Sequence, residues 1–600
     1  EVNSVMKDLE KVDIRFAMCF PDVYEIGMSH LGIQILYDMF NRREDVWCER
    51  VYSPWIDLDK IMREEKVPLF ALESQDPIKD FDFLGITIQY EMCYTNILQI
   101  LDLSGIPLFA ADRTSEDPIV IGGGPCTYNP EPLADFFDIF YIGEGETVYD
   151  QLLDAYKANK ISGGSRTEFL EKAAQIEGLY VPAFYDVTYH EDGTIASFLP
   201  NNEHAKPVIQ KQMVTDLSTA IYPKKPVVPF IKVTQDRVVL EIMRGCIRGC
   251  RFCQAGMLYR PTRERDLEML KTYAKEMLKN TGHEEISLSS LSSSDHTYLK
   301  ELVTFLIEEF KEQGINISLP SLRIDSFSLD VMSKVQDIKR SSLTFAPEAG
   351  SQRMRDAINK GLTEEMILDG AGEAFKGGWN KVKLYFMLGL PGETEEDMRD
   401  IARLADKVAR RYYEIPKEQR NGKCQITSST SFFIPKPFTP FQWATMCNQE
   451  DYIAKAYIVN NEMKEQLNRK SLRYHWHEAD VTILEGVFAR GDRKVSKVLL
   501  EAYRLGCLYD SWTETFCNEK WMQAFENTKV DIGFYNLRER SMDEIFPWDF
   551  IDIGVTKEFL KKEWERSKEG LVTPNCRMQC AGCGVAKYKG GVCVESKSKI

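Results

Sequence analysis

The stretch that decides the fold reads Arg244-Gly245-Cys246-Ile247-Arg248-Gly249-Cys250-Arg251-Phe252-Cys253. Its cysteines follow the spacing Cys-x3-Cys-x2-Cys on one short loop. Three thiolates on such a loop can hold three irons of a cubane 4Fe–4S cluster. The fourth iron then lacks a nearby protein ligand, which is typical of a reactive centre rather than a structural one. A structural zinc site is the disfavoured alternative, since none of the seven histidines is close to the loop in sequence.

Strand and helix patterns alternate on both sides of this loop. Val238–Ile242 is an apolar strand that leads into Cys246. Strand patterns follow at Ile286–Leu291, Ile315–Leu319, Ser342–Phe345, Val382–Leu388 and Gln425–Phe433. Helical patterns lie between them, as at Leu267–Leu278, Tyr298–Glu312 and Glu395–Arg411. The alternation predicts a full or partial βα barrel over residues 236–445, with its chemistry at the carboxyl ends of the strands.

The N-terminal part, residues 1–160, shows a second alternating series. Strand patterns at Asp13–Phe20, Leu69–Leu72 and Phe83–Ile88 alternate with helical patterns at Met28–Phe40 and Asn96–Leu103. This order predicts a parallel, doubly wound α/β sheet, which binds ligands at the carboxyl ends of its strands. Two glycine groups follow later strand patterns there: Gly122, Gly123 and Gly124, then Gly143 and Gly145. They are candidate cofactor contacts, although glycines also simply form tight turns.

The remaining regions are less regular. Residues 161–235 are expected to connect the two α/β units, with a hairpin or two, and residues 446–570 read as mainly helical. Residues 571–600 form a cysteine-rich tail. Cys576, Cys580 and Cys583 repeat the x3, x2 spacing, and Cys593 follows. Four thiolates suffice for a closed 4Fe–4S cluster or a zinc site, and without Cys593 the cluster also has an open iron.

The composition fits a soluble, globular, cytoplasmic protein. Apolar residues make up 44% and charged residues 28% of the 600. No apolar run is long enough to span a bilayer and no signal segment is visible, so no membrane partner is expected. The net charge of −17 gives no strong nucleic-acid signature. A group of arginines surrounds the cysteine loop and indicates either a mixed-charge surface or an anion site: Arg237, Arg244, Arg248, Arg251, Arg260, Arg263 and Arg265.

The cysteine loop resembles that of the radical S-adenosylmethionine (SAM) superfamily, and Phe252 before the third cysteine also fits. The resemblance implies a 4Fe–4S cluster on Cys246, Cys250 and Cys253, with SAM on the open iron. Ser290 closes a strand with a hydroxyl that could face the cofactor. In the segment that resembles a SAM-contacting strand end, Glu348 could accept from the SAM amine or ribose, and Arg353 could pair with its carboxylate; an ordinary ion pair is the alternative.

The resemblance reaches beyond the barrel. Gly389 and Pro391 lie in a turn, Gly389-Leu390-Pro391-Gly392, like one that lies beside SAM in related enzymes. Phe20–Ser29 and Ile121–Pro125 resemble the N-terminal domain of cobalamin-binding radical SAM proteins. The chain lacks the Asp-x-His-x-x-Gly motif whose histidine binds cobalt from below, because His30 has the wrong spacing. Cobalamin is therefore a possible cofactor whose lower face would be free, or the domain has kept the fold and lost the cofactor.

The resemblance implies a radical SAM enzyme, with cobalamin-dependent methylation or a related modification of an unactivated carbon as the first hypothesis. It also implies an electron donor of the flavodoxin or ferredoxin type. The second hypothesis is a cobalamin-independent enzyme that uses a tail cluster for sulfur insertion or for RNA or protein modification. The third is a non-enzymatic iron–sulfur sensor or assembly factor. The substrate class stays open, because no motif distinguishes a small molecule from a peptide or RNA, and catalytic side chains are not assigned.

Overall fold

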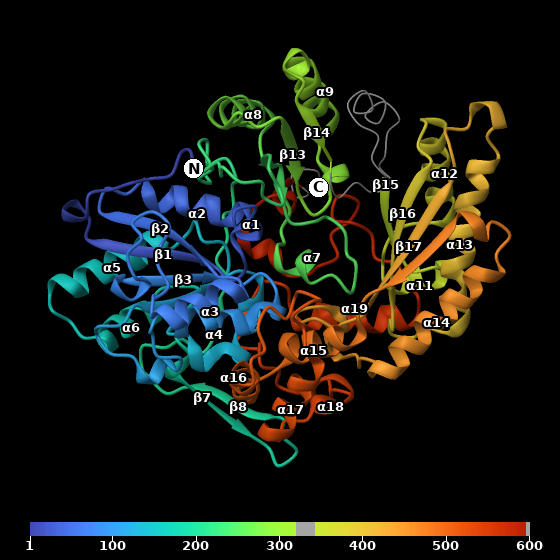
Figure 1. Cartoon of the computed structure of the whole chain (residues 1–600). Coiled ribbons are helices and arrows are strands. Elements are labelled where there is room, and N and C mark those ends of the chain that lie inside the picture. Colours follow the sequence, from blue (N-terminus) through green and yellow to red (C-terminus); the bar gives the residue numbers. More distant parts are fainter. Residues whose placement is uncertain (320–342, 596–600) are drawn as a thin grey trace.

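The computed structural model of the chain describes residues 1–319 and 343–595. An α/β unit at the N-terminus, two further parallel sheets and a set of C-terminal helices surround the cysteine loop (Figure 1). Within the described residues, no helix is both long and apolar enough to cross a membrane. Residues 320–342, which include Ser342 of one predicted strand, lie outside this description.

The N-terminal sheet has the strand order β2-β1-β3-β4-β5-β6. Neighbouring strands from β2 to β5 are parallel, and β6 is antiparallel to β5. The strands are β1 (Ile14–Phe20), β2 (Val46–Tyr52), β3 (Phe83–Thr87), β4 (Ile119–Gly123), β5 (Ile139–Tyr141) and β6 (Leu179–Tyr180). The helices are α1 (Tyr24–Gly27), α2 (Leu31–Asn41), α3 (Ile56–Glu65), α4 (Tyr94–Leu103), α5 (Tyr149–Ile161) and α6 (Arg166–Ala174). This confirms the doubly wound prediction and places a topological switch point between β1 and β3, where such sheets bind ligands.

A short connecting region follows this sheet. A hairpin of β7 (Tyr185–Tyr189) and β8 (Ile195–Pro200) comes first. Strand β9 (Ile209–Gln210) then pairs with β19 (Ile551–Asp552) near the other end of the chain. The predicted strand at Leu69–Leu72 is wrong, because only Phe70 makes an isolated bridge, to Pro77.

Two parallel sheets make up the central region. The first contains β10 (Val238–Glu241), β13 (Glu285–Ser289) and β14 (Asn316–Ser318). The second contains β15 (Leu343–Glu348), β16 (Lys381–Leu388), β17 (Gln425–Phe432) and β18 (Leu472–Trp476). Helices cover them: α8 (Leu267–Thr281), α9 (Leu299–Phe310), α11 (Gln352–Ala357), α12 (Glu364–Lys376), α13 (Glu395–Tyr413) and α14 (Gln449–Glu465). The edge strand β18, which contains His475, was not among the strand patterns predicted from the sequence.

The burial pattern of β16 explains how the second sheet is oriented. Val382, Leu384, Phe386 and Leu388 are buried, and the residues between them are more exposed. The buried residues belong to a core shared with helix α13. In Figure 1, helices α12 to α14 lie along one side of β15 to β17. The sheet therefore has one packed face and one more open face, as expected for alternating side chains.

The C-terminal helices share their hydrophobic core with the N-terminal sheet. They are α15 (Ala479–Arg490), α16 (Ser496–Arg504), α17 (Asn518–Thr528), α18 (Ile532–Asn536), α19 (Lys557–Lys568) and α20 (Val592–Glu595). Leu484, Phe488 and Trp521 lie in the same buried cluster as strands β1 and β3. Asn129 donates hydrogen bonds to the carbonyls of Ala489 and Gly491, at 3.0 and 2.9 Å. The first and last parts of the chain therefore form one packed body.

Gly350 allows helix α13 to pack closely on the segment after β15. A Cβ added at Gly350 would stand 2.7 Å from the Cα of Ile401. We predict that Gly350→Ala lowers the free energy of unfolding by about 1–3 kcal/mol, as overpacking does. Gly372→Ala is the matched control: its Cβ would meet nothing closer than 4.0 Å, so it should change stability by no more than about 1 kcal/mol. Equal denaturation midpoints for the two variants would contradict this packing argument.

Candidate active site

The cysteine loop lies between two very short antiparallel strands, β11 (Met243–Arg244) and β12 (Arg263–Glu264), and it contains helix α7 (Gln254–Leu258). Cys253 caps α7 and its sulfur accepts from the amide of Gly256 at 3.3 Å. Gly245 has a φ of 83°, and a Cβ there would stand 2.5 Å from the carbonyl oxygen of Tyr259. The glycine is therefore required for the tight start of the loop.

Burial raises the pKa of the Cys246 thiol to about 12 and that of Cys253 to about 11. Both thiols are thus protonated in the metal-free chain, and iron would have to displace the protons. Among the residues that the structure describes, no three His, Cys, Asp or Glu side chains are arranged to ligate one metal ion. A cubane cluster differs from a single ion in that each cysteine binds a separate iron. The loop offers one cysteine to each of three irons and leaves the fourth iron open.

The arginines around the loop are neither a mixed surface nor a vacant anion site. Arg251, Arg260, Arg263 and Arg265 are all at most 4% exposed. Each arginine of the group makes ion pairs or donates to carbonyl oxygens; Arg248, for example, pairs with Asp295 at 2.5 Å. Buried charges require such partners. Both interpretations from the sequence are corrected, because these guanidinium groups hold the protein together around the cysteines.

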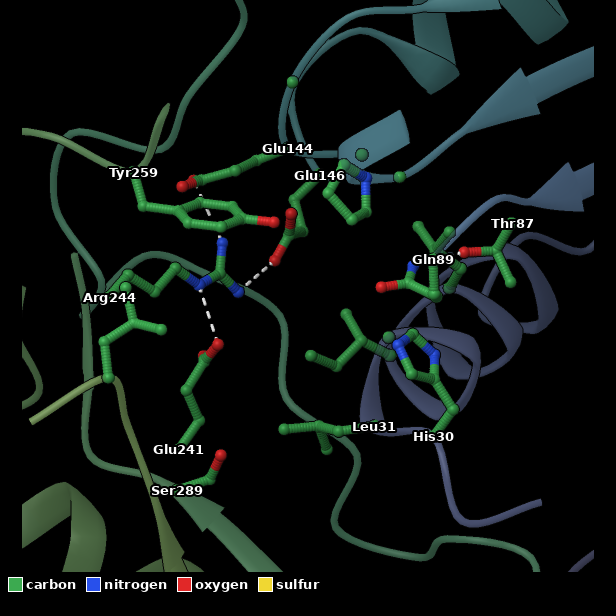
Figure 2. A pocket seen from close by; sticks show the side chains of 18 of the residues that line it. His30, Leu31, Thr87, Gln89, Glu144, Glu146, Glu241, Arg244, Tyr259 and Ser289 are labelled. Atoms are coloured by element: carbon green, nitrogen blue, oxygen red, sulfur yellow. Dashed lines mark hydrogen bonds and ion pairs between the residues drawn. The ribbon is translucent and has the colours of Figure 1, made fainter. Parts of the chain in front are cut away.

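Arg244 is the centre of this network. It pairs with Glu241 of β10 at 2.9 Å, and with Glu144 and Glu146 of the N-terminal unit at 3.0 and 2.5 Å (Figure 2). Burial alone would raise the pKa of Glu144, but the charges of Arg263 and Arg244 hold it below its ordinary value. Arg244 therefore ties the carboxyl edge of the N-terminal sheet to the start of the cysteine loop.

A cavity of about 380 Å³ lies at this junction. One wall comes from the N-terminal unit and includes His30, Thr87 and Gln89; the opposite wall comes from the central region and includes Tyr259 and Ser289 (Figure 2). The full lining is His30, Leu31, Gly32, Ile35, Leu36, Thr87, Gln89, Gly124, Pro125, Gly143, Glu144, Gly145, Glu146, Glu241, Met243, Arg244, Gly245, Tyr259, Ser289, Ser290 and Leu291. The cavity thus includes the β1/β3 switch point and reaches Gly245, next to Cys246.

The glycines predicted to contact a cofactor divide into two sets. Gly124, Gly143 and Gly145 line the cavity. Gly122 does not, because it is in β4 and packs on Phe137 and Phe140 in the core. Gly123 ends β4 and is not among the lining residues. Gly143 also serves the fold: it bridges to Gln212, whose amide nitrogen would be 2.6 Å from an added Cβ.

The residues predicted to contact SAM lie in different surroundings. Ser290 lines the cavity, and its hydroxyl is 2.9 Å from that of Ser293. Glu348 has a φ of 68° and pairs with Lys360 at 3.3 Å. Lys360 lies 6.0 Å from the centre of the Phe252 ring. The charges of Lys360 and Glu348 both influence the pKa of Cys253. Glu348 and Phe252 are therefore close to the third cysteine, as the resemblance implies.

Arg353, Gly389 and Pro391 make contacts within the protein instead. Arg353 pairs with Asp397 and donates to the carbonyl of Gly392 at 2.9 Å, and its side chain is 55% exposed. The structure thus favours the ordinary ion pair at a helix start over a SAM carboxylate contact. The Gly389 amide donates to Glu393 at 2.9 Å, inside the turn between β16 and α13 that also contains Pro391.

Several lining residues were not singled out from the sequence: Thr87, Gln89, Glu241, Tyr259 and, as a cavity residue, His30. Burial lowers the pKa of His30 to about 4, so its imidazole is neutral at pH 7. Nδ1 accepts from the amide of Ile33 at 3.3 Å, so this nitrogen is occupied by the start of helix α2. Polar residues directly after a buried strand, as in Thr87-Ile88-Gln89, are the signal that could have identified this wall.

The tail cysteines lie against the same loop. The amide of Cys576 donates to the carbonyl of Ile247 at 3.0 Å. Electrostatic contacts join Cys576, Cys580, Cys583 and Cys593 to one another. Helix α19 precedes them and docks through Glu563, which accepts from Arg251 at 3.0 Å. Helix α19 therefore brings the tail to the cysteine loop.

Removing the Arg244 guanidinium should destabilise the junction more than removing a peripheral one. Arg244→Met leaves three largely buried carboxylates without this partner, and we predict a loss of about 3–5 kcal/mol in the free energy of unfolding. Arg237→Met is the control: Arg237 pairs with Glu285 at a more exposed position, so its loss should cost about 1 kcal/mol or less. Chemical denaturation measures both; a similar loss for the two variants would show that Arg244 has no special role.

Two family models match the chain. One describes the N-terminal region of radical SAM proteins and covers residues 32–182, and the other describes the radical SAM superfamily and covers residues 240–405. An uncharacterized protein of Methanocaldococcus jannaschii is 29% identical over 525 residues, which is 86% of this chain and 97% of the relative. An uncharacterized methyltransferase of Pyrococcus horikoshii is 25% identical over 343 residues, which is 55% of this chain and 65% of the relative.

Two solved structures are similar at low sequence identity. The radical SAM methyltransferase TsrM from Kitasatospora setae, with cobalamin and a [4Fe–4S] cluster bound, is 12% identical with a TM-score of 0.46; the match covers 72% of this chain and 79% of TsrM. The cobalamin-dependent radical enzyme OxsB, with aqua-cobalamin bound, is 13% identical with a TM-score of 0.47, covering 93% of this chain and 80% of OxsB. Similarity at this level says nothing about the reaction of this chain.

The cysteine loop that follows β10 and the two family models show that the chain is a radical SAM enzyme, with a 4Fe–4S cluster and SAM as its cofactors.

Proposed function

We propose that this radical SAM enzyme is cobalamin-dependent and methylates, or modifies in a related way, an unactivated carbon. The observation that carries the proposal is the cavity at the junction of the N-terminal unit and the central region. Its lining combines the switch point of the doubly wound sheet with the residues that start the cysteine loop and end β13. A second cofactor on the sheet would therefore face the site of radical formation. The relative from Pyrococcus horikoshii is described as an uncharacterized methyltransferase, which supports the proposal.

The walls of the cavity fit a corrin in their chemistry. Leu31, Ile35 and Leu36 supply an apolar surface beside the sheet, and Thr87 and Gln89 supply a hydroxyl and an amide. A cavity with mainly apolar walls and a few placed polar groups is the usual form of a cofactor site. Because Nδ1 of His30 accepts from Ile33 and the Asp-x-His-x-x-Gly motif is missing, a corrin would bind here without a histidine below its metal.

In this proposal the residues of the chain bind the cofactors, orient them and shield them from water. Cys246, Cys250 and Cys253 would hold the cluster, Glu348 would accept hydrogen bonds from SAM, and Ser290 would donate one to it. When bound, the cluster supplies the electron that splits SAM into methionine and a 5′-deoxyadenosyl radical, and the corrin supplies a methyl group. Arg244 fixes the two walls of the cavity relative to each other, which keeps the reacting groups in place. The electron would come from a flavodoxin- or ferredoxin-type donor.

SAM cleavage should depend on the first cysteine group. Anaerobically reconstituted protein, given SAM and dithionite, should form 5′-deoxyadenosine, measured by liquid chromatography. Cys250→Ser should reduce the product to background, because it removes a cluster ligand. Cys517→Ser, at a partly exposed position with Glu519 as its neighbour, should leave the yield unchanged. Equal yields from both variants would exclude this loop as the site of cleavage.

Cobalamin binding should depend on the cavity. Hydroxocobalamin absorbance should stay with the protein through gel filtration. Gln89→Trp places a large ring in the cavity and should weaken retention by about tenfold or more, or about 1.4 kcal/mol. Gln523→Trp, on the exposed side of α17, should retain the corrin like the parent chain. Loss of corrin from the parent chain, with 5′-deoxyadenosine formation intact, would instead favour a cobalamin-independent enzyme.

A further inference from the structure

The tail wraps closely around the first cysteine loop. Besides the bond from Cys576 to Ile247, the amide of Val592 donates to the carbonyl of Thr262 at 3.0 Å. Asn359 links the two segments, because its side chain accepts from the amide of Thr573 at 2.9 Å and donates to the carbonyl of Gly249 at 3.0 Å. These contacts fix the tail on both sides of the loop.

Arg260 is shared by the two cysteine groups. It is 4% exposed, and it donates to the carbonyls of Gly256 at 3.0 Å and Arg248 at 3.1 Å within the first loop. Cys576, Cys583 and Cys246 act on its guanidinium and oppose the effect of burial on the pKa of Arg260. Arg260 therefore lies where the first loop and the tail meet.

A disulfide or a zinc ion explains the tail less well than a cluster. All fifteen cysteines are free thiols in the structure. Cys576, Cys580 and Cys583 repeat the x3, x2 spacing of the loop that holds the first cluster, and Cys593 supplies a fourth thiol. Cys583 is buried and Cys580 is exposed. In a cubane each of four such cysteines binds a separate iron.

We infer that Cys576, Cys580, Cys583 and Cys593 hold a second 4Fe–4S cluster, docked directly on the loop of the first. Arg260 is the positioning residue between them. Because Cys576 bonds to Ile247, filling the tail site also fixes the backbone next to Cys246. The inference concerns the tail alone and does not depend on cobalamin in the cavity.

Iron analysis of the whole chain tests the inference. Anaerobically reconstituted protein should contain about eight iron atoms per chain, since each cubane holds four. The triple variant Cys576→Ser, Cys580→Ser, Cys583→Ser should retain about four irons and still form 5′-deoxyadenosine. Cys517→Ser is the control and should keep about eight.

A second triple variant, in the first cysteine group, separates loss of the tail cluster from misfolding of the tail. Cys246→Ser, Cys250→Ser, Cys253→Ser should also retain about four irons, now in the tail, and form no 5′-deoxyadenosine. About four irons in the parent chain, about one zinc per chain, or full iron in the tail variant would each overturn the second cluster. Failure of 5′-deoxyadenosine formation with eight irons present would count against the proposed activity, not against the tail cluster.

Electron paramagnetic resonance tests the role of Arg260. Arg260→Lys keeps the charge but loses the planar set of donors that reaches both groups. We expect full iron content with altered spectra of both reduced clusters. Arg237→Lys, remote from the tail cysteines, should leave both spectra unchanged. Unaltered spectra in Arg260→Lys would show that this residue does not connect the sites.

Discussion

The rest of the structure depends on the ion pairs and hydrogen bonds that three guanidinium groups make around the cysteine loop. Arg244 pairs with Glu144 and Glu146 of the N-terminal unit, and Arg251 pairs with Glu563 of α19. Arg260 donates to carbonyl oxygens of the loop itself. A charge is costly to bury without partners, so each arginine defines where its partner segment must lie. The loop is thereby fixed to the N-terminal sheet on one side and to the tail on the other.

This arrangement has a consequence for chemistry. A radical must be generated next to the group that it attacks and away from water, so the surrounding segments have to be held rigidly. In this chain the first and last parts share one core, and the central region is tied to them at Arg244. The cavity lies at that tie, between the β1/β3 switch point and the start of the cysteine loop.

Local pattern predicted the fold well, and long-range pairing limited the prediction of the site. The spacing of Cys246, Cys250 and Cys253 is local, and so is the buried strand β10 that precedes them. By contrast, two partners of Arg244, Glu144 and Glu146, lie about a hundred residues earlier, so sequence alone left the arginines ambiguous. Gly122 and Gly124 are close in sequence, yet one packs in the core and the other lines the cavity, because β4 ends at Gly123 and the chain turns at Gly124, where φ is 101°. Edge strand β18 was missed because its half-exposed residues resemble a loop.

The most direct test of the central claim is an anaerobic crystal structure with SAM and hydroxocobalamin. The claim is that one cavity joins the sheet of the N-terminal unit to the site of SAM cleavage. We expect corrin density at the carboxyl ends of β1 and β3, between Gln89 and Tyr259, with SAM bound to the cluster held by Cys246, Cys250 and Cys253. Corrin density elsewhere, or SAM on the cluster with the cavity lacking a corrin, would contradict the account.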